Sequence, residues 1–233
     1  MNGTDAGPPD VDLDRVWLGV AAQVWRRQPG WLERAAGRLL RSPGLARALV
    51  ITPSLLPGWL IATAVVLVAG LLATRGTGTP YVPLVAPAVA GAGVAYAYGP
   101  GTDPAWELSR SMAVSDRMVL LVRALAVFGL NAGLGLAASA ASGTAVAITF
   151  GWLVPMTAVC ALALAAATVS QSSDVGVAAG MAGWVITVLG ARVASGRLIA
   201  AVANARLVLP YLVFAAACGA VAWYATRIPR GNT

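Results

Sequence analysis

Six long apolar runs constrain this chain more than any other feature of its sequence. Each run is long enough for a helix to cross the roughly 30 Å hydrocarbon core of a bilayer. Backbone polar groups inside a bilayer must bond to one another, so runs of this length form helices. We predict an all-α membrane protein with spans at residues 50–74, 80–98, 117–140, 145–169, 175–195 and 206–226.

The composition agrees with a surface that mostly faces lipid. Only 11% of the residues are charged and 58% are hydrophobic, whereas soluble domains carry about 25% charged residues. All 16 basic side chains are arginines, which is typical of GC-rich genomes such as those of actinobacteria. The net charge is +7. The arginines that produce it cluster near the ends of the predicted helices, which favours anionic lipid headgroups over nucleic acid as their partner.

The absence of histidine excludes several classes of function within this chain. Histidine-ligated haem, His-containing zinc sites and Ser-His-Asp hydrolysis all require a residue that the sequence lacks. Cys160 and Cys218 lie in apolar runs and are interpreted as small core residues, with a disulfide as the alternative. We therefore predict no catalytic, cofactor-binding or metal-binding residues and no enzymatic activity of its own.

We predict a separate cytoplasmic region in the first 48 residues, followed by a membrane domain at 49–228 and a short cytoplasmic tail at 229–233. Apolar residues recur at helical spacing in 13–24 and again in 32–41. This pattern predicts an amphipathic helix in the headgroup plane that leads into the first span; a merely basic flank is the alternative. The predicted interfacial residues are Trp25, Arg26, Arg27, Trp31, Arg34, Arg38 and Arg41.

The arginines also predict the orientation in the cytoplasmic (inner) membrane. With the N-terminus inside, ten arginines fall on the cytoplasmic side: six in 26–47, two in 110–117 and two in 227–230. The outer side then holds Arg75, Arg197 and Arg206, with Arg192 near a helix end. Because positive charge concentrates in cytoplasmic loops, we expect both termini in the cytoplasm.

The polar connection between the second and third spans contains a strong helix start. Asp103 is a suitable N-cap and Pro104 suits the first helical position, so we predict a cytoplasmic helix over 104–114. Its charged and aromatic side chains are Trp106, Glu107 and Arg110. Such a helix is interpreted as a rigid coupling element for a soluble partner, or alternatively as a surface helix that only anchors two spans.

Residues 101–131, GTDPAWELSRSMAVSDRMVLLVRALAVFGLN, resemble the permease subunits of type-2 ABC transporters. The resemblance extends to the layout of nearly the whole chain and implies that the 104–114 helix docks on an ATP-binding subunit. It further implies coupling contacts from Asp103, Pro104, Trp106, Glu107 and Arg110. A second permease subunit would complete a homo- or heterodimer, and the pair would export a hydrophobic or amphipathic compound. With no lysine the chain cannot form a G-x-x-x-x-G-K-[ST] phosphate loop, so ATP and Mg²⁺ belong to the partner.

A second resemblance concerns the N-terminal Trp-Arg-Arg segment at 25–27. It resembles membrane proteins encoded beside sigma-factor regulators, although the chain lacks their Cys/His zinc cluster. The alternative function is therefore a membrane-bound signalling or anti-sigma-like protein whose first 48 residues bind a cytosolic regulator.

A few residues within the spans stand out against their apolar surroundings. Asn131 could hydrogen-bond across helices or contact substrate, and Gly129 and Gly133 could serve packing within one subunit or a dimer seam. Arg123 is expected to extend to the cytoplasmic interface rather than act in gating. Asp174 is expected to cap the fifth span, with a secondary contact to the ATP-binding subunit as the alternative.

Overall fold

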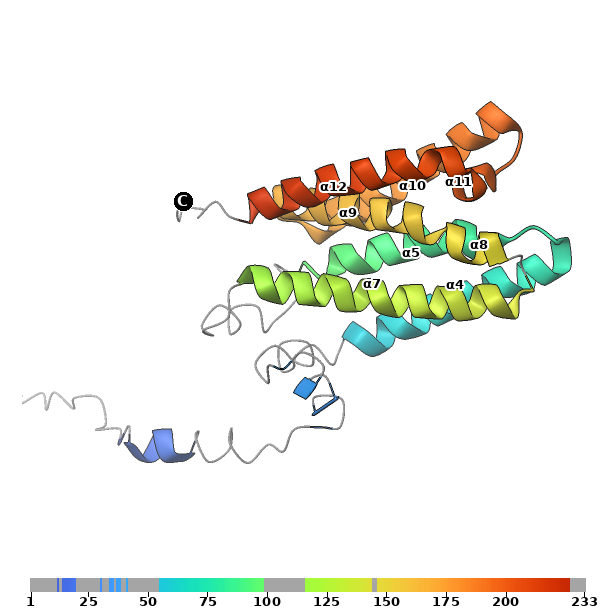
Figure 1. The fold of residues 1–233 in the computed structure, drawn as a ribbon. Coiled ribbons are helices and arrows are strands. Elements are labelled where there is room, and N and C mark those ends of the chain that lie inside the picture. The colour runs from blue at the N-terminus through green and yellow to red at the C-terminus, as the bar shows by residue number, and fades with distance from the viewer. Residues whose placement is uncertain are drawn as a thin grey trace, which may run out of the picture. The chain divides into compact units, whose positions relative to one another are not determined.

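The computed structural model describes residues 12, 14–19, 30, 34, 35, 37, 38, 41, 55–98, 116–143 and 146–226. The chain divides into two compact units, Met1–Ala46 and Arg47–Thr233. The larger unit is a helical bundle (Figure 1). Its helices are α4 (Leu55–Thr77), α5 (Tyr81–Tyr96), α7 (Asp116–Ala141), α8 (Val146–Gly151), α9 (Leu153–Ser170), α10 (Ser173–Ser195), α11 (Ala200–Ala203), the 3₁₀-helix η1 (Ala205–Leu207) and α12 (Val208–Ala225).

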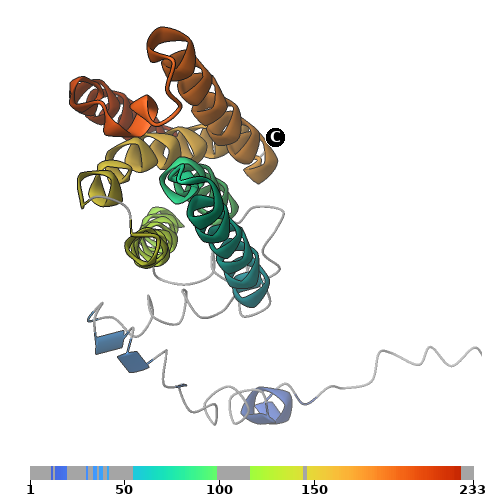
Figure 2. The same ribbon diagram turned by 90° about the vertical axis from the view of Figure 1, so that its right-hand side faces the viewer.

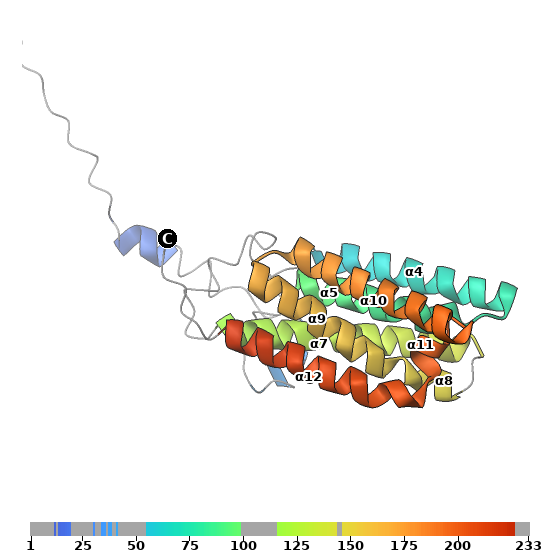
Figure 3. The same cartoon turned by 90° about the horizontal axis from the view of Figure 1, so that it is seen from above.

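The expected all-α membrane architecture is confirmed in its general form. Five helices are long and apolar enough to cross a membrane: α4, α7, α9, α10 and α12. They run alongside one another, as the view from above shows (Figure 3). In the described part of the chain every regular element is helical.

The second predicted span is shorter than expected. Helix α5 contains 16 residues, which corresponds to a length of about 24 Å. It packs against α4, α7, α9 and α10 and lies in the middle of the bundle when viewed along the helices (Figure 2). Neighbouring helices therefore cover most of α5, and ten of its residues are buried.

Helices α4 and α5 form an antiparallel hairpin that is closed by one side chain. The Thr74 hydroxyl donates to the Gly70 carbonyl at 2.7 Å and accepts from the Tyr81 backbone N–H at 3.0 Å. The Arg75 guanidinium donates to the Ala141 carbonyl at 2.9 Å, which joins the ends of α4 and α7. These two helices are therefore parallel to each other and antiparallel to α5.

The fourth predicted span, 145–169, is wrong as a single helix. It is broken at Trp152 into α8 and α9. Pro155 lies in the first turn of α9 and has no N–H to donate to the carbonyl of residue 151, so one helical hydrogen bond is missing at this point. Trp152, the residue between α8 and α9, is fully buried.

Small residues hold α10 against α9. A Cβ at Gly176 would lie 2.7 Å from the Ala163 carbonyl oxygen, so only glycine permits this approach. The cap of α10 differs from the expectation: Ser172, not Asp174, is the N-cap, and its hydroxyl accepts from the Val175 N–H at 3.4 Å. Asp174 instead lies in the first turn, where a carboxylate is stabilised by the helix dipole.

The connection between α10 and α12 contains a short helical element. This element is α11, whose Ala201 and Val202 are buried. The Tyr211 hydroxyl donates to the Ala201 carbonyl at 2.8 Å and holds α11 against the start of α12. A Cβ at Gly151 would lie 3.3 Å from the Val202 carbonyl oxygen, so α11 also approaches α8 closely.

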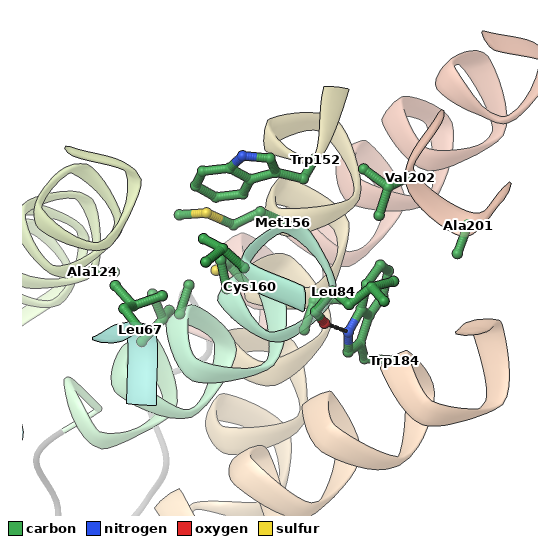
Figure 4. Close-up of a cluster of buried hydrophobic side chains, with 14 residues drawn as sticks. Leu67, Leu84, Ala124, Trp152, Met156, Cys160, Trp184, Ala201 and Val202 are labelled. Carbon is green, nitrogen blue, oxygen red and sulfur yellow. Dashed lines mark hydrogen bonds between the residues drawn. The ribbon is translucent and has the colours of Figure 1, made fainter. Parts of the chain in front are cut away.

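Large side chains fill the centre of the bundle (Figure 4). Trp152 lies over Met156, and the Trp184 indole N–H donates to the Leu84 carbonyl at 2.6 Å. Cys160 belongs to this core, and both cysteines are free. The expectation of a small core residue is confirmed for Cys160, whereas Cys218 is only partly buried.

The smaller unit is described in short pieces. Residues 14–19 are helical, and the Asp12 carboxylate accepts from the Arg15 backbone N–H at 3.1 Å at the start of this helix. Val16, Trp17 and Leu18 are exposed, Trp17 at 71%. The helix therefore leaves apolar side chains uncovered within its own unit.

Candidate functional site

The predicted coupling segment lies outside the described residues. The helix over 104–114 and the contacts from Asp103, Pro104, Trp106, Glu107 and Arg110 therefore stay predictions. The structure does describe the two points where this segment joins the bundle, the end of α5 and the start of α7.

These two points meet in a small buried cluster. Tyr98, Leu120 and Ala167 pack together, with Leu164 against them. The cluster joins the residues after α5, the first turns of α7 and the last turns of α9. The segment 99–115 is thus attached at both ends to packed helices at one end of the bundle.

The arginines expected outside lie at the opposite end. Arg75 and Arg192 lie in the last turns of α4 and α10, and Arg197 and Arg206 lie in the connection before α12. In the smaller unit Arg34, Arg38 and Arg41 are exposed, and their place at a membrane interface stays a prediction. Trp25, Arg26, Arg27 and Trp31 lie outside the described residues.

One face of α7 carries the polar residues of that helix into the bundle. Arg123, Asn131 and Ser139 recur at helical spacing and are exposed by only 8%, 3% and 0%. Arg123 is buried near the start of α7, and its expected reach to the cytoplasmic interface stays a prediction. The Asn131 side-chain amide donates to the Val127 carbonyl at 2.8 Å, so this bond lies within α7.

Gly129 and Gly133 lie on the other face of α7. Both are exposed, and a Cβ at either position would meet nothing within 4 Å among the described residues. They do not mediate packing in this part of the subunit. Gly176, Gly180 and Gly183, which face α9, do mediate close packing.

Three buried side-chain polar atoms have no hydrogen-bond partner among the described residues. They are Trp59 Nε1, Thr63 Oγ1 and Trp152 Nε1. We call these three residues, together with Asn131, the polar seam. Contacts at the glycines of α4, α5 and α7 give the position of each member along the bundle.

The contacts between α4 and α5 give the positions of Trp59 and Thr63 along the bundle axis, which we call their levels. A Cβ at Gly70 would lie 3.5 Å from Val82 Cγ2, and a Cβ at Gly93 would lie 2.7 Å from Trp59 Nε1. Trp59 therefore faces Gly93 near the end of α5. Thr63 lies one turn further along α4, at the level of residues 89 and 90 of α5.

The contacts between α5 and α7 place Asn131 at the same level. A Cβ at Gly93 would also lie 3.0 Å from Val127 Cγ1, whereas one at Gly135 would lie 3.5 Å from Ala86 Cβ. Asn131, midway between Val127 and Gly135, therefore also lies opposite residues 89 and 90. Thr63 and Asn131 thus approach the same stretch of α5 from two parallel helices.

Trp152 closes the seam one turn beyond Asn131. A Cβ at Gly135 would lie 2.6 Å from Trp152 Cη2, so the indole packs directly on the α7 backbone. Val127 and Gly135 are eight residues apart, which separates the Trp59 and Trp152 levels by about 12 Å along the bundle.

No protein-family model, curated protein or solved structure matches this chain. The function must therefore be argued from the chain itself. Among the described residues no group of three His, Cys, Asp or Glu side chains could hold a metal ion. The polar seam is the feature of the described bundle that offers unpaired polar groups.

Of the seam residues, the sequence singles out only Asn131. Trp59, Thr63 and Trp152 are uncharged residues in apolar runs, and such residues are common in membrane helices. A polar side chain in an apolar run is the only signal, and it does not distinguish a residue that faces lipid from one that faces the interior.

Proposed function

We propose that this chain is the permease subunit of an ATP-driven ABC transporter, with ATP hydrolysis in a separate subunit. The proposal rests first on the resemblance of residues 101–131. It is supported by one structural observation: both ends of segment 99–115 join the same packed end of a bundle of apolar helices. A helix attached there would pass movement of a soluble partner directly to α5, α7 and α9.

The proposal includes six membrane passes. Five helices meet the length requirement, and α5 runs from the Thr74–Tyr81 contact at one end to Trp59 near the other. Helix α5 thus follows α4 for most of its length. A short central helix avoids hydrophobic mismatch with lipid because neighbouring helices surround it.

The orientation and partners follow from the same scheme. Both termini and segment 99–115 would be cytoplasmic, at the end opposite Arg75, Arg192, Arg197 and Arg206. Two permease subunits would form the pathway with two ATP-binding subunits. The apolar helices suit a hydrophobic or amphipathic compound, and export is the proposed direction.

Co-purification tests the proposal. The full chain is co-expressed with an ATP-binding-cassette protein encoded beside it and is purified in mild detergent. The wild type is compared with the Trp106→Ala, Glu107→Arg double variant. We expect the wild type to retain the ATP-binding protein and the variant to lose it. Arg197→Glu, a charge reversal on an exposed residue at the other end of the bundle, is the matched control and retains binding.

If wild type and both variants all fail to bind an ATP-binding protein, the transporter proposal is wrong. If both variants bind as wild type does, the 104–114 helix is not the coupling element.

A regulatory function is the second candidate, and one observation favours it. Residues 1–46 form their own unit, and its helix at 14–19 exposes Val16, Trp17 and Leu18. Uncovered apolar side chains of this kind suit either a membrane surface or a protein partner. Retention of a sigma factor by the wild type, with loss on Trp17→Ala, Leu18→Ala, would favour the regulatory function.

A further inference from the structure

We propose that one end of the bundle is a binding surface for anionic phospholipids. This end is formed by the last turns of α4 and α10 and by η1 at the start of α12, and we call it the arginine end. The lipid phosphate would contact arginines, and an acyl chain of the same lipid would lie along an exposed leucine. The inference goes beyond the proposed transport function and does not depend on an ATP-binding partner or on the orientation of the chain.

The arginine end carries four exposed cations. It lies where α4 turns into α5 and where α10 leads through α11 into α12 (Figure 1). Arg75 and Arg192 lie in the last turns of α4 and α10, and Arg197 and Arg206 lie in the connection before α12. All four are exposed. Arg75 also donates to the Ala141 carbonyl at 2.9 Å, which keeps its charge at the end of α7.

No carboxylate of the segments that form this end balances the four charges. Residues 70–80, 139–153 and 190–210 contain neither Asp nor Glu. Asp174, the one acidic residue of α10, lies in the first turn at the other end of that helix. The arginine end is therefore positively charged, and its partner is expected to be an anion.

Three of the arginines lie three residues from an exposed leucine. The pairs are Leu72 and Arg75, Leu189 and Arg192, and Leu209 and Arg206. The leucines are exposed by 62%, 51% and 69%. Residues three apart lie on the same face of a helix, and in each pair the arginine is nearer to the end of the bundle. Each pair thus presents an apolar surface and then a cation, which is the order of acyl chain and phosphate in a phospholipid.

The leucines favour a lipid over a soluble anion. Helices α4, α10 and α12 are long and apolar enough to cross a membrane, so leucines exposed on them face hydrocarbon, and the arginines beyond reach the headgroups. Guanidinium groups form strong, often bidentate hydrogen bonds with phosphate. A zwitterionic headgroup brings its own cation, whereas an anionic headgroup does not. The arginine end therefore suits anionic phospholipids.

Site-specific photo-crosslinking tests the proposal. The full chain is placed in nanodiscs that contain equal parts of phosphatidylglycerol and phosphatidylcholine. Val193, which follows Arg192 and is 89% exposed, is replaced by photoreactive benzoylphenylalanine, and the captured lipids are counted by mass spectrometry. We expect at least about twofold more capture of phosphatidylglycerol than of phosphatidylcholine, because arginines near the membrane surface attract anionic lipid.

Two triple variants, each combined with the same photoreactive residue, show whether the arginines cause the enrichment. Arg192→Gln, Arg197→Gln, Arg206→Gln is expected to return the ratio of captured lipids to that of the mixture. The matched control removes three exposed arginines of the smaller unit, Arg34→Gln, Arg38→Gln, Arg41→Gln, and is expected to leave the ratio unchanged.

Two results would overturn the proposal. The first is capture at residue 193 in the ratio of the mixture when all arginines are present, a result that needs none of the glutamine variants. The second is an enrichment that persists when Arg192, Arg197 and Arg206 are replaced. Neither result involves an ATP-binding protein, so failure of this proposal is distinct from failure of the transporter proposal.

Discussion

The two sides of α5 are packed by different means. Toward α9 and α10, small residues bring backbones into contact and the Trp184 N–H is bonded to a carbonyl of α5. Toward α4 and α7, Trp59 and Thr63 bring buried polar atoms that have no partner in the described part of the chain. The first side has the features of a rigid scaffold. The second retains costly polar groups, as functional regions commonly do.

The largest expected effect tests the scaffold side. Gly176→Ala places a methyl group 2.7 Å from the Ala163 carbonyl oxygen and 2.7 Å from the Ala167 Cβ. Neither contact can be relieved by a side-chain rotation, so we expect a loss of about 1–3 kcal/mol in unfolding free energy. Unfolding in mixed detergent micelles measures it.

Gly190→Ala in the same helix is the matched control. A Cβ there would meet nothing within 4 Å among the described residues, so the variant should be neutral or more stable by up to about 1 kcal/mol. Equal destabilisation of the two variants would contradict the tight packing of α10 on α9.

A smaller effect compares the two sides of α5 directly. A methyl group on Gly91 would lie 2.7 Å from Val159 Cγ1, and one on Gly93 would lie 2.7 Å from Trp59 Nε1. Val159 is β-branched and has little rotamer freedom in a helix, whereas Trp59 is only partly buried and can shift. The β-branched Val127 also faces Gly93, but its Cγ1 would lie farther from the new methyl group, at 3.0 Å. We expect Gly91→Ala to lower the unfolding free energy by about 1–3 kcal/mol and Gly93→Ala by less than about 1 kcal/mol.

The same unfolding measurement shows which side of α5 is packed more rigidly. A larger loss for Gly93→Ala than for Gly91→Ala would show that the seam side is the more rigid one. The comparison between the two sides would then be reversed.

The smallest effect isolates a single hydrogen bond. Trp184→Phe and Trp152→Phe remove similar volumes from buried positions, but only Trp184 donates to a carbonyl, at 2.6 Å. We expect Trp184→Phe to be more destabilising by about 0.5–1.5 kcal/mol, the net value of one hydrogen bond. Thermal unfolding of the two variants in one detergent measures the difference. Equal losses would indicate that the Trp152 N–H is bonded as strongly in the membrane as that of Trp184.

The helix boundaries show which structural features of this chain the sequence patterns predict. The apolar runs predicted α4, α7, α10 and α12 within a few residues, because run length is a local property. Pro155 favours a kink in the fourth span, but the runs did not predict a break at Trp152, or the Ser172 cap in place of Asp174. Both depend on which of several nearby residues satisfies a backbone group once neighbouring helices are in place.

The polar seam shows what the sequence patterns do not predict, namely which side chains of a helix are buried. Asn131 was expected to matter, and the structure buries it on the inner face of α7. Gly129 and Gly133, grouped with it on spacing alone, lie on the opposite face. Thr63 resembles every other threonine of the spans until the unbonded state of its hydroxyl is seen.

The sequence by itself determined that this protein is helical, apolar enough for a membrane and free of histidine and lysine chemistry. Those properties depend on composition and run length, which need no knowledge of neighbours. Only the tertiary structure decided which side chains face inward, because a helix that is apolar on all sides carries no periodic signal for its buried face. The packing of α4, α7 and α9 around α5 therefore determines the polar seam, although each of its residues is visible in the sequence.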